Sequence, residues 1–190
     1  MTDPSVWLAQ VRQLEARGEL LLAFDTALHG LEEHPDDLRL RHRAVLNLAK
    51  AGATANAEME FERLGLEHTD DADVAALKAR IAKDHALDAS GEVRINLLSH
   101  AADLYEALYQ RNKDYYPGVN VASLRLLAGQ TIAAENMARE VLVICQSGIG
   151  HHDDDYYRPA SEAEAALVLG DTATARLALE RAAKAGNDLA

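Results

Sequence analysis

The sequence has one cysteine, no long apolar run and no secretory signal. Cys145 is its only cysteine, so no intrachain disulfide can form. No apolar run approaches the roughly 20 residues of a membrane-spanning helix. The start, MTDPSVWLAQ, lacks the basic and apolar segments of a secretory signal. We therefore expect a soluble, cytoplasmic protein.

Basic residues are also in short supply. Lysine and arginine number 19 against 31 aspartate and glutamate residues, which gives a formal charge of −12. Nucleic acids and anionic membrane surfaces are bound by basic stripes, and no such stripe runs along this chain. The sequence therefore predicts no nucleic-acid partner and no membrane partner, although a local basic cluster could still hold a small anion.

Proline (4 residues) and aromatic residues (5%) are scarce, and runs of β-branched residues are rare. Alanine, leucine and glutamate, which favour helix, are abundant. The 48% of hydrophobic residues can form a sizeable core in 190 residues without disulfides or metals. These features predict an all-α protein.

Glycines mark a repeat. Gly18 and Gly52 are 34 residues apart, and each precedes an alanine, Ala23 or Ala57, by five residues. That period is typical of the tetratricopeptide repeat, in which glycine ends the first helix and a small residue lets the second helix approach it. Six residues fall on the consensus positions of one repeat, namely Trp7, Leu14, Gly18, Ala23, Gly30 and Pro35.

The same glycine and alanine spacing returns at Gly129 and Gly170, and a degenerate pair of helical segments surrounds the DASGE break between the two regions. We expect about five tetratricopeptide-like helix pairs in one continuous, right-handed superhelix. Residues 1–71 would form two ordinary repeats, and residues 72–190 would form specialised ones. The first helix of each pair would line the concave face, where repeat proteins bind partners.

All 6 tyrosines lie in the second half of the chain. Two tyrosine pairs open the fourth and fifth first helices, while the third carries the string RIAKD, whose charged residues share a helix face. Phenol rings, cations, an acid and an amide together suit a nucleotide-like ligand. We therefore predict a ligand-binding patch of Arg80, Lys83, Asp84, Tyr115, Tyr116, Asn120 and Tyr157.

Each group also has a structural explanation that the sequence leaves open. Arg80, Lys83 and Asp84 could form a solvated face with an internal ion pair. Pro117 and Gly118 could shape the start of a helix that Asn120 caps.

The sequence predicts no catalytic residue, no metal site and no cofactor. The string from His151 to Asp155 contains metal-ligand types, but consecutive loop residues cannot all face one ion. Cys145 lies on an apolar helix face, so we expect a buried, small hydrophobic residue.

The strings LKARIAKD, YYPGVNVASLRLLAG and DYYRPASEAEAALVLGDTATA resemble the tetratricopeptide-like TRAFs-binding domain of mitogen-activated kinase kinase kinases, in a bacterial-type form. The resemblance covers roughly residues 73–183. Family members usually read GRIYKD, so Ala79 and Ala82 depart from the pattern. The resemblance implies a regulatory scaffold for protein partners. Similar repeats in bacterial signalling and defence systems are thought to sense nucleotide-derived small molecules.

The leading hypothesis is a non-enzymatic scaffold that binds a protein or peptide on its concave face in a signalling or defence assembly. The alternative is a sensor of a nucleotide-derived small molecule, or an enzyme that acts on one with Asp84 as its acid or base. No polar capping helix follows the last repeat, so Leu177 and Leu179 could also mediate a homodimer.

Overall fold

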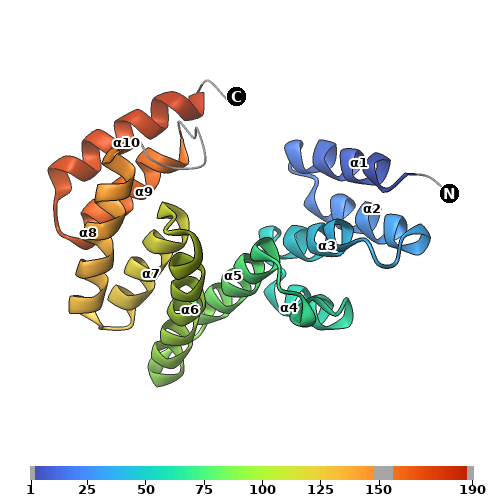
Figure 1. Ribbon diagram of the computed structural model, residues 1–190, viewed down its shortest axis with the longest axis horizontal. Helices are drawn as coiled ribbons and strands as arrows, with labels where there is room; N and C mark the ends of the chain where they lie inside the picture. The colour runs from blue at the N-terminus through green and yellow to red at the C-terminus, as the bar shows by residue number, and fades with distance from the viewer. Residues whose placement is uncertain (1–2, 148–155, 188–190) are drawn as a thin grey trace. The chain divides into compact units, whose positions relative to one another are not determined.

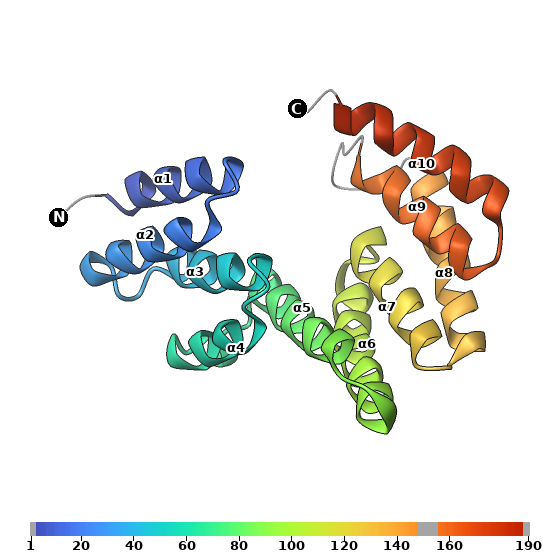
Figure 2. The same ribbon diagram turned by 180° about the vertical axis from the view of Figure 1, so that it is seen from behind.

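The computed structural model describes residues 3–147 and 156–187. Within those ranges the regular elements are ten α-helices and one 3-10 turn, and successive helices such as α1 and α2, α7 and α8, and α9 and α10 pack as antiparallel pairs (Figures 1 and 2). The prediction of an all-α fold of about five tetratricopeptide-like helix pairs is confirmed. The elements are α1 (Pro4–Ala16), α2 (Leu20–Glu33), α3 (Leu38–Lys50), α4 (Thr54–Arg63), η1 (Leu66–His68), α5 (Ala72–Asp88), α6 (Gly91–Asn112), α7 (Tyr115–Leu127), α8 (Thr131–Ser147), α9 (Tyr157–Val168) and α10 (Thr172–Asn187).

The turns inside four of the pairs share one backbone geometry. Their glycines have φ angles between +74° and +79°, a left-handed conformation that residues with a Cβ adopt only under strain. The alanine five residues after each glycine is buried, with at most 2% of its surface exposed. The spacing seen in the sequence therefore marks the turn and the closest approach of the two helices. The glycines are Gly18, Gly52, Gly129 and Gly170, and the alanines are Ala23, Ala57, Ala134 and Ala175.

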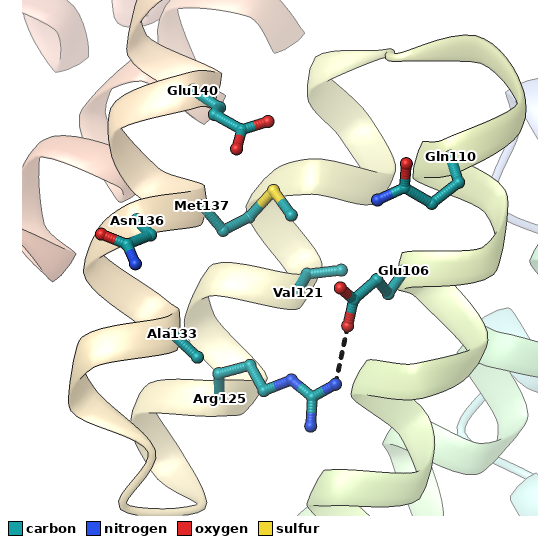
Figure 3. A pocket seen from close by; sticks show the side chains of 8 residues that line it. All are labelled: Glu106, Gln110, Val121, Arg125, Ala133, Asn136, Met137 and Glu140. Atoms are coloured by element: carbon teal, nitrogen blue, oxygen red, sulfur yellow. Dashed lines mark hydrogen bonds and ion pairs between the residues drawn. The ribbon is translucent and has the colours of Figure 1, made fainter.

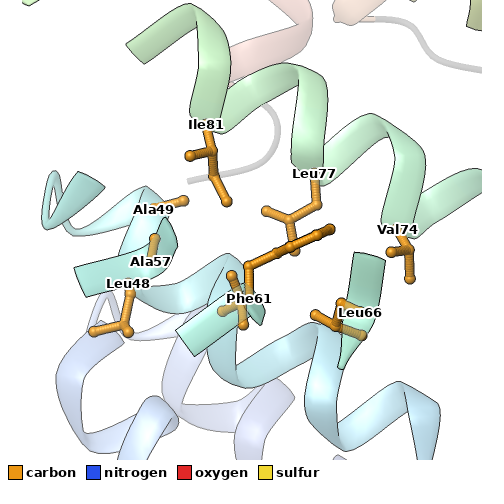
Figure 4. Packing of buried hydrophobic residues seen from close by; sticks show 9 residues of the cluster. Leu48, Ala49, Ala57, Phe61, Leu66, Val74, Leu77 and Ile81 are labelled. Atoms are coloured by element: carbon orange, nitrogen blue, oxygen red, sulfur yellow. The ribbon is translucent and has the colours of Figure 1, made fainter. Parts of the chain in front are cut away.

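The chain divides into two compact units, residues 1–85 and residues 86–190. The predicted boundary at residue 71 is a different one, because it separates ordinary repeats from specialised repeats by their sequence. It stays a prediction. In the first unit, Phe61 of α4 shares one buried apolar cluster with Leu48 of α3 and with Leu77 and Ile81 of α5 (Figure 4). These apolar side chains hold α5 against α3 and α4, the helices of the second repeat.

In the second unit, α7 is the central helix, because eight of its 13 residues are buried. It packs against α6, α8 and α9. Gly118 faces its neighbours so closely that an added Cβ would lie 2.7 Å from Cγ2 of Val141 in α8 and 3.2 Å from Cδ2 of Tyr109 in α6. The glycine therefore serves close helix packing.

This geometry corrects the interpretation of YYPGVN as a shaped helix start capped by Asn120. The helix already begins at Tyr115, and the carboxylate of Asp114 caps it by accepting a hydrogen bond from the Tyr116 amide. Pro117 lies in the first turn, where a missing N–H costs no helical hydrogen bond. Asn120 is the sixth residue of α7, so its side chain does not cap that helix.

Candidate functional site

The candidate site of the second unit lies on the shared face of α7 and α9. Tyr116 and Tyr157 occupy equivalent positions, each 13 residues before a turn glycine, and 44% and 61% of their surfaces are exposed. Ser123 and Glu164 follow them by seven residues, or about two helical turns, and so lie on the same faces. The Ser123 hydroxyl donates a hydrogen bond to Oε1 of Glu164 at 2.5 Å. Because this bond joins the two helix faces, Tyr116 and Tyr157 belong to one surface, which we call the tyrosine face.

Tyr116 has one contact through its ring and one through its backbone. Its ring meets that of the buried Tyr105 of α6 edge to face, with 6.2 Å between the ring centroids. The Asn120 amide donates a hydrogen bond of 2.9 Å to the Tyr116 carbonyl. Asn120, only 8% exposed, therefore turns its side chain toward its own helix. That Asn120 contacts a ligand stays a prediction.

Tyr115 has a different environment from its neighbour. It is only 4% exposed, and the guanidinium carbon of Arg158 lies 5.8 Å from the centre of its ring. At that distance a cation is attracted to the face of an aromatic ring. Tyr115 thus anchors Arg158, and a positive charge stands where α7 and α9 begin.

Tyr157 projects from the start of α9. It meets Tyr156 edge to face, with 5.0 Å between the ring centroids. Tyr156 in turn lies against α10, where a Cβ added to Gly186 would come within 3.3 Å of the Tyr156 ring. Tyr156 therefore supports Tyr157, whose ring is the more exposed of the two.

The three charged candidates belong to α5, in the first unit. Nε of Arg80 lies 3.6 Å from Oδ2 of Asp84, which is the ion pair expected between residues four apart on one helix face. Lys83 lies on the same helix. The other four candidates belong to the second unit, so the convergence of all seven residues stays a prediction.

Three further observations bear on chemistry. Burial, reinforced by the charge of Glu162, raises the pKa of Cys145 to about 12, and its side chain is 6% exposed. The expected buried, small hydrophobic residue is confirmed.

Residues His151 to Asp155 lie outside the described residues. In residues 3–147 and 156–187, no group of three histidine, cysteine or acidic side chains is placed to hold a metal ion, and no helix is long and apolar enough to cross a membrane.

The sequence analysis does not predict Ser123 and Glu164 as site residues. A signal is present in the sequence, because Ser123 follows Tyr116 by seven residues and Glu164 follows Tyr157 by the same number. Their contact depends on how α7 packs against α9, which no spacing along a single helix reveals.

Comparison with known proteins supports the repeat architecture. The chain resembles a solved thermophilic tetratricopeptide repeat protein of Thermus thermophilus, with a TM-score of 0.75 and 18% identity over 98% of this chain and 94% of that one. It also resembles a structure described as MamA MSR-1 C2, with a TM-score of 0.55 and 12% identity over 98% of both chains. At these identities the likeness shows the fold alone. No curated protein matches. Residues 20–125 match the family described as Tetratricopeptide Repeats-Sensor. The chain therefore belongs to the Tetratricopeptide Repeats-Sensor family.

Proposed function

We propose that this protein is a non-enzymatic sensor that binds a nucleotide-derived small molecule on the tyrosine face. The proposal rests on the two exposed phenol rings of Tyr116 and Tyr157, which occupy equivalent positions on one surface, and on the cation of Arg158, which follows Tyr157 in the chain and lies over the ring of Tyr115. The description of the family as a sensor supports the same assignment. We also propose that the protein works in the cytoplasm.

The chemistry of the tyrosine face suits such a ligand. Stacking of a base on an aromatic side chain is worth about 1–3 kcal/mol. The guanidinium of Arg158 can pair with phosphate, and the starts of α7 and α9 add the positive ends of two helix dipoles. Ser123 and Glu164 offer hydroxyl and carboxylate groups to a ribose. Arg80, Lys83 and Asp84 stay proposed ligand contacts, and each can be tested on its own.

A protein or peptide partner is the second candidate, because apolar side chains extend the same region. Leu126 and Leu127 of α7 and Leu167 of α9 are 38%, 52% and 54% exposed. Repeat stacks bind partners on such surfaces. The similarity to the TRAFs-binding domain supports a partner in a signalling or defence assembly. A homodimer through Leu177 and Leu179 also stays a proposal, and both leucines are about half exposed.

Thermal shift of the full chain tests the sensor proposal. A ligand that binds only the native state raises the melting temperature by mass action. The probes are ATP, ADP-ribose and a cyclic dinucleotide. We expect at least one to raise the melting temperature, and we expect Tyr157→Ala to weaken its binding about tenfold, the value of one lost stacking contact.

The matched control is Ile132→Ala on α8, because Ile132 is 79% exposed and lies on neither α7 nor α9. It should leave the shift unchanged. Lys83→Ala tests the α5 residues separately. A shift that survives Tyr116→Ala combined with Tyr157→Ala would refute the tyrosine face, and turnover of a bound probe that Asp84→Asn abolishes would favour an enzyme instead.

A further inference from the structure

A pocket of about 220 Å³ opens between α6 and α8, with α7 as its floor (Figure 3). Val121 and Arg125 of α7 line it. At 100° per residue these positions point about 140–180° away from Tyr116 on the same helix. The pocket is therefore separate from the tyrosine face and plays no part in the function proposed above.

The cation of the lining, Arg125, is already bound to acids. Its Nη2 donates to Oδ1 of Asp103 at 2.6 Å and to Oε2 of Glu106 at 2.7 Å. Nη1 donates to Oε1 of Gln130 at 2.8 Å. Two carboxylates, of Asp103 and Glu106, thus surround the single guanidinium of Arg125. Together these three side chains carry a formal charge of −1.

A third carboxylate lies across the pocket. Glu140 of α8 accepts a hydrogen bond of 2.7 Å from the hydroxyl of the buried Tyr109 of α6, which fixes its position. Burial, together with the hydrogen bond and the charge of Glu140, raises the pKa of Tyr109, so the phenol stays a neutral donor. The carboxylate of Glu140 therefore lies at the edge of the pocket.

Apolar groups lie between the two acidic sides. Figure 3 shows the Met137 side chain between Glu140 and Glu106, with Val121 below it and Ala133 on the adjoining turn. A site with carboxylates at two ends and apolar carbon between them suits a cation on an alkyl chain and disfavours an anion. Among the described residues, no three acidic, histidine or cysteine side chains are arranged to hold a metal ion, which favours an organic cation.

We propose that this pocket binds an alkylammonium or alkylguanidinium group, with Glu140 pairing with the charge and Met137 covering the alkyl chain. Two sources can supply that chemistry, a free amine or a lysine or arginine side chain of a peptide. The chain's formal charge of −12 adds a general attraction for cations.

Methionine methyl NMR of the full chain tests the proposal, because the sequence has only 3 methionines. Met137 lines the pocket, and Met59, on α4 of the first unit, is an internal reference. The probes are cadaverine, agmatine and a blocked Gly-Lys-Gly peptide. We expect at least one probe to shift the Met137 methyl signal saturably and to leave Met59 unchanged.

Three variants make the result specific. Glu140→Gln keeps an acceptor for Tyr109 and should raise the Kd about tenfold or more, as expected for a lost charged hydrogen bond. Ala133→Leu fills the pocket from an exposed position and should abolish binding. Glu135→Gln, on the same helix but outside the lining, should change the Kd less than about twofold, because a distant surface charge contributes little.

The outcomes separate the two sources. A shift with the free amines supports a small-molecule ligand, and a shift with the peptide alone supports a protein side chain. A Met137 signal that no probe moves overturns the proposal, and so does an unchanged Kd in both Glu140→Gln and Ala133→Leu.

Discussion

Replacing Gly118 by alanine should destabilise the second unit although alanine is the better helix former. An ideal Cβ at this position lies 2.7 Å from Cγ2 of Val141, whereas carbon atoms pack best at about 3.5–4.0 Å. Either α7 or Val141 must therefore move by roughly 1 Å in a buried region. Overpacking of this kind costs about 1–3 kcal/mol, and the helix propensity of alanine returns about 1 kcal/mol. We expect a net loss of up to about 2 kcal/mol.

A double-mutant cycle with Val141→Ala identifies the cause. Val141 is fully buried, so its truncation alone should cost about 2–3 kcal/mol through lost burial and a cavity. It also removes the methyl group that the new Cβ would strike. The double variant should therefore be more stable than the sum of the single effects predicts, by about 1–2 kcal/mol. Urea unfolding followed by circular dichroism measures all four free energies. A Gly118→Ala protein more stable than the parent, or additive effects, would refute the close-packing explanation.

Three further predictions concern turns, protonation and thiol access. Alanine at Gly18, Gly52, Gly129 or Gly170 should cost about 1–2 kcal/mol at each position, because their φ angles agree within 5°; widely unequal losses in urea unfolding would contradict this. Burial lowers the pKa of His42, with Asp73 opposing the shift and Arg43 adding to it. His42 therefore binds a proton near pH 6.5 in the unfolded state but only at lower pH in the folded state. The free energy of unfolding should decrease as the pH falls below about 6.5, and it should decrease less in His42→Gln. A pH profile identical in both proteins would exclude this role. Cys145, with its pKa raised to about 12, should resist a thiol reagent at pH 8 until urea unfolds the second unit, and rapid labelling of the native protein would show that its burial is incomplete.

The repeat architecture could be predicted from the sequence because one backbone requirement recurs. A left-handed glycine followed by a buried alanine is needed wherever two helices turn back on each other, so Gly18 and Ala23 reappear in other pairs. Helices α5 and α6 were harder to predict. They have 17 and 22 residues, and Gly91, with a φ of +62°, opens α6 and follows the end of α5 by only three residues.

Glycine also explains where the prediction failed. The sequence suggests that Gly118 and Pro117 shape the start of a helix, yet Gly118 lies inside α7 and serves contact with α6 and α8. Chain-local patterns cannot tell a glycine that bends the backbone from one that lets a neighbour approach. For the same reason they did not separate Tyr115, which is buried, from Tyr116, which is exposed.

The hydrogen bond from Tyr109 to Glu140 has a mechanical consequence. In a simple stack each helix bears load only through its immediate neighbours, and the stack bends like a spring. This bond links α6 to α8 and skips α7, so the three helices form a triangulated frame. Sliding α8 along α6 therefore requires this hydrogen bond to break in addition to the packing of each helix on α7.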